Sequence, residues 1–148
     1  MPEAERSPKS GLKSRLFQEP FGIWTQRAIA VATAVYTAVL VFTTHYPKPE
    51  DLLGRKLPPD KLMHFGAYAV LGVLAALVLR SRGRLVGRYA PLLGAGLAGW
   101  AALDEATQPL FGRAAEPLDW VCDVIGLALG IAAVVITNHL WRQARRAG

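Results

Sequence analysis

The sequence predicts an all-α fold: a polytopic membrane protein built as one bundle of four transmembrane helices. The first observation is composition, since 52% of the 148 residues are hydrophobic and only 19% are charged, whereas soluble domains average about 25% charged residues. The second is that the charges are clustered, so that long uncharged apolar runs alternate with short charged segments. The third is that the strict two-residue alternation of barrel strands is missing, which leaves helices as the structure that lipid permits.

The first two apolar runs approach the length of a span, about 20 residues with a range of about 17 to 25. The run 28–44 contains no charge, and Trp24 and Tyr46 flank it as interfacial anchors. No small-x-small cleavage site follows this run, so we expect a retained span and not a signal peptide. The run 62–79 is interrupted only by His64 and is the second predicted span.

The other two runs end or begin at acidic residues. The run 89–103 is short and is followed by Asp104 and Glu105, so the last turn of the third helix is polar. The run 124–141 is the fourth predicted span, and Asp123 lies at its edge. Because a charge at the bilayer centre costs about 2.5 to 3.5 kcal/mol on insertion scales, we expect Asp123 to face other helices and to find a partner there.

The basic residues predict the orientation. Of the 17 Lys and Arg residues, 12 lie in the N-terminal segment, in the 80–88 loop and in the C-terminal tail. Because cytoplasmic loops carry an excess of Lys and Arg, we expect both termini inside and the loops 45–61 and 104–120 outside. The predicted organisation is a partly disordered cytoplasmic tail at 1–22, a single membrane domain at 23–141 and a cytoplasmic tail at 142–148.

Composition also excludes some functions. The net charge of +6 does not indicate nucleic-acid binding, because the basic residues flank apolar runs and form no single soluble basic face. Cys122 is the single cysteine, so it cannot form an internal disulfide or a cysteine-rich zinc site, and we interpret it as a packing residue. No covalent cofactor is implied and none is assigned, while the oligomeric state stays open.

Polar residues gather at the predicted outer end of the second helix. Asp60, His64 and Tyr68 are spaced by four residues and therefore share one helix face. Lys61 follows the first of them and is close to the expected headgroup region. These residues predict a polar face that needs partners on other helices.

The third and fourth helices supply such partners. Asp104 and Gln108 become neighbours if the third helix continues by one turn, and Asp119 and Asp123 repeat this spacing. Arg113 lies in the turn between the two helices. Since alternating helices bring these ends to one face of the membrane, we predict a mixed hydrogen-bonded cluster there. The candidate ligand-binding residues are Asp60, Lys61, His64, Tyr68, Asp104, Glu105, Gln108, Arg113, Asp119 and Asp123.

A stripe of small residues predicts how the fourth helix packs. Gly126 and Gly130 lie on the same face as the two aspartates of that helix, and small residues allow helices to approach closely. Gly94, Gly96 and Gly99 make the third helix the expected close-packing partner. This packing would turn the acidic face of the fourth helix inward.

The combined pattern resembles a known family. Asp-Lys-x-x-His-Phe-x-x-Tyr at 60–68, Asp-Glu-x-x-Gln at 104–108, Arg113, and Asp-x-x-x-Asp-x-x-Gly at 119–126 occur in this order. Together they resemble the VanZ-like family of small bacterial membrane proteins, whose founding member is associated with low-level resistance to the glycopeptide teicoplanin. The family often has Asn where this chain has Asp123. The resemblance implies a multi-helix protein of the bacterial cytoplasmic membrane linked to the cell envelope, and it supplies no reaction.

Several interpretations of the cluster stay open. The carboxylates form a salt-bridge and capping network, bind a divalent cation or another ligand, or act as acid–base groups. His64 is a general base paired with an acid such as Glu105, or a buried structural histidine. Arg113 recognises a phosphate or carboxylate, or clamps the acidic helix ends. The candidate catalytic residues are His64, Glu105 and Asp104, and no metal site is assigned.

These interpretations lead to three functional hypotheses. In the first, the outward cluster binds an amphiphile with an anionic head, such as a polyprenyl-phosphate-linked precursor or a lipoglycopeptide acyl tail. In the second, the protein is an enzyme that acts on an envelope lipid, although no nucleophile or phosphate-loop motif is present. In the third, the protein is a scaffold or regulator. The expected partners are the bilayer and an envelope lipid or lipid-linked precursor, with no nucleic acid.

Overall fold

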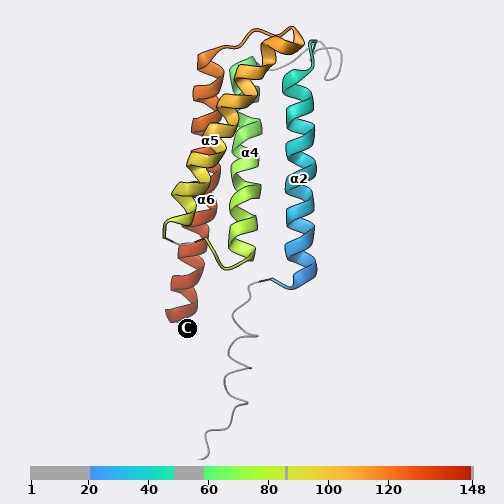
Figure 1. Cartoon of the computed structure of the whole chain (residues 1–148). Helices are drawn as coiled ribbons and strands as arrows, with labels where there is room; N and C mark the ends of the chain where they lie inside the picture. The colour runs from blue at the N-terminus through green and yellow to red at the C-terminus, as the bar shows by residue number, and fades with distance from the viewer. Residues whose placement is uncertain (1–20, 49–58, 86, 148) are drawn as a thin grey trace, which may run out of the picture.

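The computed structural model describes residues 21–48, 59–85 and 87–147, and positions 1–20 of the predicted tail at 1–22 lie outside them. The described part of the chain is all-α, as predicted (Figure 1). Its elements are the helices α2 (Ile23–His45), α4 (Asp60–Ser81), α5 (Tyr89–Thr107) and α6 (Pro117–Ala147), with a short 3₁₀ helix η1 (Gln108–Phe111) after α5.

Three of these helices are long and apolar enough to cross a membrane. They are α2, α4 and α6, with mean hydropathies of 1.6, 2.1 and 2.2 in their most apolar windows. Many large apolar side chains on them are exposed, among them Val31 and Val35 on α2 and Leu129 and Ile136 on α6. Exposed apolar faces of this kind suit lipid. The chain is therefore a multi-pass helical membrane protein by helix length and hydropathy.

Helix α5 is not among the three candidate spans. It has 19 residues and ends with two buried carboxylates, Asp104 and Glu105, which lower its mean hydropathy. The run 89–103 does form a helix, as predicted. Its role as a fourth span remains a prediction.

Helix α6 is longer than the predicted span 124–141. It has 31 residues and begins at Pro117, whose fixed φ and missing N–H suit the first turn of a helix. At the other end it continues through Arg145 and Arg146, which the sequence placed in a cytoplasmic tail. Basic residues in the last turn interact favourably with the negative end of the helix dipole.

The closest helix contact joins α4 and α6. A Cβ atom added to Gly126 or Gly130 would collide with the backbone carbonyl oxygen of Phe65 or Ala69, respectively. A Cβ on Gly72 of α4 would lie 2.6 Å from the carbonyl oxygen of Leu127. The two backbones therefore touch, and the predicted close packing at the glycine stripe of α6 is confirmed.

The predicted partner of that stripe was wrong. The partner is α4, whereas the stripe was expected to pack on the third helix. A Cβ on Gly96 or Gly99 of α5 would meet nothing within 4 Å, and one on Gly94 would make only an ordinary contact of 3.8 Å with Ile131. Helix α5 packs on α6 through larger side chains, and its glycines add no close backbone approach.

The helices run alternately up and down, so that each end of the bundle collects four helix ends (Figure 1). We call the end where α2 ends, α4 begins, α5 and η1 end and α6 begins the acidic end. A core cluster lies next to it: Leu40, Tyr68, Leu71, Ala101 and Leu127. The opposite end holds the start of α2, the 80–88 loop and the end of α6, and we call it the basic end.

Candidate functional site

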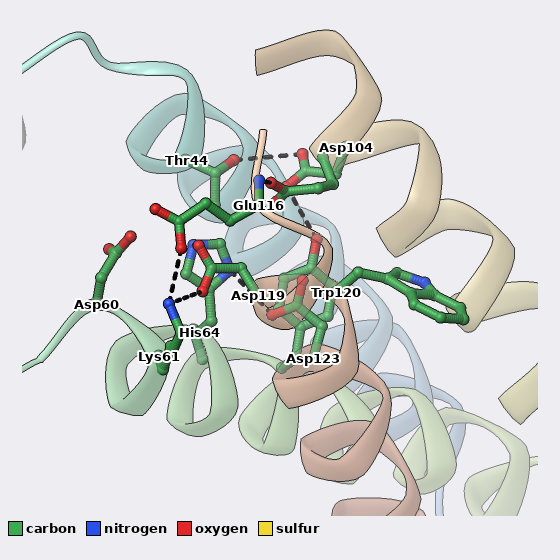
Figure 2. Close-up of polar contacts among 12 residues, drawn as sticks. Thr44, Asp60, Lys61, His64, Asp104, Glu116, Asp119, Trp120 and Asp123 are labelled. Atoms are coloured by element: carbon green, nitrogen blue, oxygen red, sulfur yellow. Dashed lines mark hydrogen bonds and ion pairs between the residues drawn. The ribbon is translucent and has the colours of Figure 1, made fainter. Parts of the chain in front are cut away.

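The predicted polar cluster lies at the acidic end of the bundle (Figure 2). Four carboxylates there are almost fully buried, with exposed fractions between 1% and 6%. The side chains of His64, Tyr68 and Gln108 are buried among them. The buried carboxylates are Asp104, Glu105, Asp119 and Asp123.

Asp104 joins three helices. Its Oδ2 accepts a hydrogen bond of 2.9 Å from the Tyr68 hydroxyl on α4. Its Oδ1 accepts one of 3.2 Å from the Thr44 hydroxyl on α2 and lies 3.6 Å from Nδ1 of His45. Both main donors are neutral hydroxyls. Through these two hydrogen bonds Asp104 links α5 to α2 and α4.

Glu105 faces the chain segment that leads into α6. Its Oε2 accepts a hydrogen bond of 2.9 Å from the Gln108 side chain, and its Oε1 accepts one from the backbone N–H of Glu116. The sequence paired Gln108 with Asp104, which assumed that the α-helix continued by one turn. Instead α5 ends at Thr107 and Gln108 begins the 3₁₀ helix η1, and the side-chain amide binds the residue three positions earlier.

His64 pairs with Asp123. Its Nδ1 lies 3.0 Å from Oδ1 of Asp123, and this contact crosses from α4 to α6. No hydrogen bond joins the side chains of His64 and Glu105, the pair that the sequence suggested for a general base. The reason is the glycine contact, which brings this part of α6 against the face of α4 that carries His64. Nε2 of His64 lies 4.0 Å from Oδ2 of Asp119.

The two cations occupy the rim of the cluster. Nζ of Lys61 contacts Oε2 of Glu116 at 2.8 Å and Oδ1 of Asp119 at 3.3 Å. The hydrogen bond from Lys61 lowers the pKa of the exposed Glu116 carboxyl below its usual value. Arg113 donates to the backbone carbonyl of Thr44 at 3.1 Å and lies 3.4 Å from Oδ2 of Asp60. Arg113 therefore bridges α2 and α4 and does not contact the buried acids.

Sequence reasoning missed several members of the cluster. Thr44 was considered only as the last residue of the first apolar run and His45 only as the start of the following loop, yet both reach α5, where His45 Nε2 lies 2.9 Å from the Thr107 hydroxyl. Glu116 was treated only as loop charge. Trp120 on α6 donates a hydrogen bond of 3.1 Å to the carbonyl of Ala98 on α5. The available signal for Thr44 and His45 was that polar residues stand at the end of an apolar run.

A cavity adjoins the cluster between α2 and α4. Its volume is about 220 Å³. Its lining is mainly apolar, with several polar side chains from the acidic end. The lining residues are Leu40, Thr43, Thr44, Asp60, Met63, His64, Ala67, Tyr68 and Arg113.

Two sets of side chains in the cluster have the composition of metal ligands. One is Asp60, His64 and Asp119, and the other is His64, Glu105 and Asp123. In each set one ligand atom per residue lies within 4.8 Å of the others. The chemistry open to this site therefore includes anion recognition at its cationic rim, proton transfer at His64 and cation binding by its carboxylates.

These features place the chain in the class of multi-pass helical membrane proteins. Within that class, its distinguishing feature is a cluster of buried carboxylates at one end of the bundle. No family model matches the chain, and neither the curated proteins nor the solved structures contain a match.

The bond between Tyr68 and Asp104 gives a first testable prediction. Tyr68 is fully buried, so Tyr68→Phe is expected to leave a buried carboxylate oxygen without its donor and to cost about 1 to 3 kcal/mol of stability. The measurement is the free energy of unfolding in detergent. Tyr36→Phe is the matched control, because that hydroxyl donates only to the backbone carbonyl of Ala67 in the middle of α4. Equal losses in the two variants would contradict the role given to Asp104.

Proposed function

We propose that this chain is a VanZ-like protein of the bacterial cytoplasmic membrane that binds an amphiphile with an anionic headgroup at the acidic end. The observation that carries the proposal is the cavity between α2 and α4, which is lined both by apolar side chains such as Leu40 and Ala67 and by the polar groups of His64 and Arg113. An amphiphile requires both kinds of lining, because its chain gains from apolar contact while its head needs hydrogen-bond donors. Envelope lipids and lipid-linked precursors have this chemistry.

Arg113 is the residue proposed to meet the headgroup. Its side chain is 14% exposed and lines the cavity. The contact with Asp60 is long, at 3.4 Å, and the other partner is a backbone carbonyl. A guanidinium with such partners keeps donors for a phosphate or carboxylate, which it binds in bidentate fashion.

The proposed orientation rests on charge. Within the described residues, eight of the eleven Lys and Arg residues lie at the basic end, so the positive-inside rule assigns it to the cytoplasm. The start of α2 and the end of α6 then both lie inside, and the cavity opens toward the outer face. In this arrangement α5 is the fourth span, with its two carboxylates at headgroup depth on the outer side.

The order of the motifs supports the VanZ-like assignment, and the structure is compatible with it. The residues that carry the resemblance lie on three different helices and gather at one end of the bundle. Asp123, where the family often has Asn, holds Nδ1 of His64. An influence on glycopeptide susceptibility would follow if the amphiphile were a cell-wall precursor or a lipoglycopeptide tail.

The test compares two probes that differ only in the headgroup, farnesyl phosphate and farnesol. Wild-type protein in detergent is expected to bind farnesyl phosphate more tightly, as measured by equilibrium dialysis and by the shift in melting temperature. Arg113→Gln is expected to weaken binding of the phosphate about tenfold to a hundredfold, since a hydrogen bond to a charged group contributes about 1.5 to 3 kcal/mol. Binding of farnesol is expected to stay unchanged.

Arg84→Gln is the matched control, because Arg84 is exposed at the basic end. It is expected to bind both probes as the wild type does. Equal affinity of the wild type for the two probes, or the same loss in both Arg variants, would contradict a headgroup site at Arg113.

One observation favours a second candidate function, an enzyme that acts on the headgroup. His64 lines the cavity, and Asp123 holds its other ring nitrogen, which is the arrangement of a general base with an orienting carboxylate. This function predicts release of inorganic phosphate from farnesyl phosphate, lost in Asp123→Asn. Binding without release would leave the protein a binding protein.

A further inference from the structure

Three neighbouring side chains of the cluster have polar atoms that make no hydrogen bond within the described part of the chain: His64 and Asp60 line the cavity, and Asp119 lies beside His64. Nδ1 of His64 lies 3.0 Å from Asp123, and Oδ2 of Asp60 lies 3.4 Å from Arg113. Oδ1 of Asp119 lies 3.3 Å from Nζ of Lys61 as an ion pair but has no hydrogen-bond partner within the described residues. The remaining atoms are Nε2 of His64, Oδ2 of Asp119 and Oδ1 of Asp60. None of them makes a hydrogen bond within the described residues, and the contact between Nε2 and Oδ2 is 4.0 Å long.

The imidazole carries the argument. His64 is 5% exposed, lines the cavity and leaves Nε2 without a hydrogen bond among the described residues. Oδ1 of Asp119 is a buried atom with no hydrogen-bond partner within the described residues, whereas buried polar groups are nearly always paired. When Nδ1 donates to Asp123, Nε2 carries a lone pair. Oδ2 of Asp119 lies 4.0 Å from this nitrogen. Two acceptors facing each other repel unless a proton or a metal cation lies between them.

The pair of His64 and Asp123 also has the form of a metal site. A histidine that binds a metal through one nitrogen almost always donates the other N–H to a carboxylate, a carbonyl or water, which fixes the ring. Asp123, 1% exposed, provides this carboxylate. Nε2 is therefore the ring nitrogen that remains available to bind a metal ion.

We propose that His64 Nε2, Asp119 and Asp60 bind one divalent transition-metal ion at the mouth of the cavity, with Asp123 as the residue that positions the imidazole. The three ligand atoms lie within 4.8 Å of one another. Ligands about 2.0 to 2.2 Å from a metal lie at most about 4.4 Å apart, so binding needs movements of a few tenths of an ångström. An imidazole with two carboxylates suits Zn²⁺ or Mn²⁺.

The charges around the site agree with a bound cation. Four buried carboxylates are faced by the imidazoles of His45 and His64 and by Lys61, whose side chain is 44% exposed. A divalent ion would offset part of this negative excess. Its open coordination positions would face the cavity beside Arg113, where an anionic headgroup oxygen is a suitable further ligand. The inference concerns the pocket of the proposed function, but metal binding is tested without any amphiphile.

The experiment measures metal content and stability in the full-length protein. The purified protein is stripped with a chelator and dialysed against Zn²⁺ or Mn²⁺, and bound metal is counted by mass spectrometry while the melting temperature is recorded. We expect one ion per chain in the wild type and a rise in melting temperature. Asp119→Asn and Asp60→Asn are each expected to weaken binding at least tenfold, and Asp123→Asn by about tenfold to a hundredfold.

Two control variants distinguish this site from others. Glu116→Gln removes an exposed carboxylate that contacts Lys61 outside the ligand set, and it is expected to bind metal as the wild type does. Glu105→Gln tests the rival set of His64, Glu105 and Asp123. Metal lost in Glu105→Gln and kept in Asp60→Asn would overturn the proposal, as would a wild type that binds neither ion. Asp60 is exposed, so its variant gives a result even if Asp119→Asn fails to fold.

Discussion

Gly130→Ala is expected to destabilise the protein by about 3 kcal/mol, at the upper end of the usual cost of overpacking. The added methyl group would collide with the backbone carbonyl of Ala69 on α4. A backbone carbonyl within a helix cannot move aside as a flexible side chain can, so α4 and α6 must separate. The measurement is the free energy of unfolding during titration of the detergent-solubilised protein with a denaturing detergent.

Gly96→Ala is the matched control for this prediction. A Cβ at Gly96 meets nothing within 4 Å, and alanine favours a helix over glycine by up to about 1 kcal/mol. This variant is expected to be neutral or slightly stabilised. A Gly130→Ala protein as stable as Gly96→Ala would show that the two backbones do not touch.

His64→Leu is expected to cost about 3 to 5 kcal/mol, because it removes the partner of a carboxylate that is 1% exposed. The double variant His64→Leu with Asp123→Leu is expected to recover much of this loss, since both polar groups are then gone. The measurement is a double-mutant cycle on unfolding free energies. Additive effects of the two single variants would contradict a direct interaction.

Much of the fold follows from the pattern of apolar runs. A charge-free run of sufficient length has few alternatives to a helix in lipid, so the positions of α2, α4 and α6 were predictable. The spacing of Asp60, His64 and Tyr68 fixed which residues share one helix face. Alternating directions then brought the helix ends together, and the cluster of buried carboxylates followed from the cost of unpaired charge.

The partners within the cluster were not predictable in the same way. Spacing shows which residues share a face but not how far each helix is rotated against its neighbours. For that reason His64 was paired with Glu105 on α5, whereas the contact of α6 with α4 gives it Asp123. Gln108 was misplaced because a switch from α to 3₁₀ geometry shifts its neighbour by one residue.

The same rotation of each helix about its axis, which the sequence does not give, decides which helix Thr44 contacts and whether the glycines of α5 contact α6. A threonine at the end of an apolar run is common, and nothing local indicates that it will donate to Asp104, 60 residues later. Small residues on α5 and α4 offered equivalent partners for α6. The choice between them is made by the fit of whole faces and not by any short motif.

The hydrogen bonds of the cluster also bear on how the chain is assembled during synthesis. Asp104 is synthesised after its donors Thr44 and Tyr68, and Asp123 likewise follows His64 by 59 residues. The earlier helices α2 and α4 thus supply hydroxyl and imidazole groups, and the buried carboxylates, which are costly in a membrane, are on the later helices α5 and α6. Asp104, Asp119 and Asp123 therefore each follow their partners on α2 and α4 along the chain, whereas Gln108 and the N–H of Glu116, the partners of Glu105, are synthesised after it.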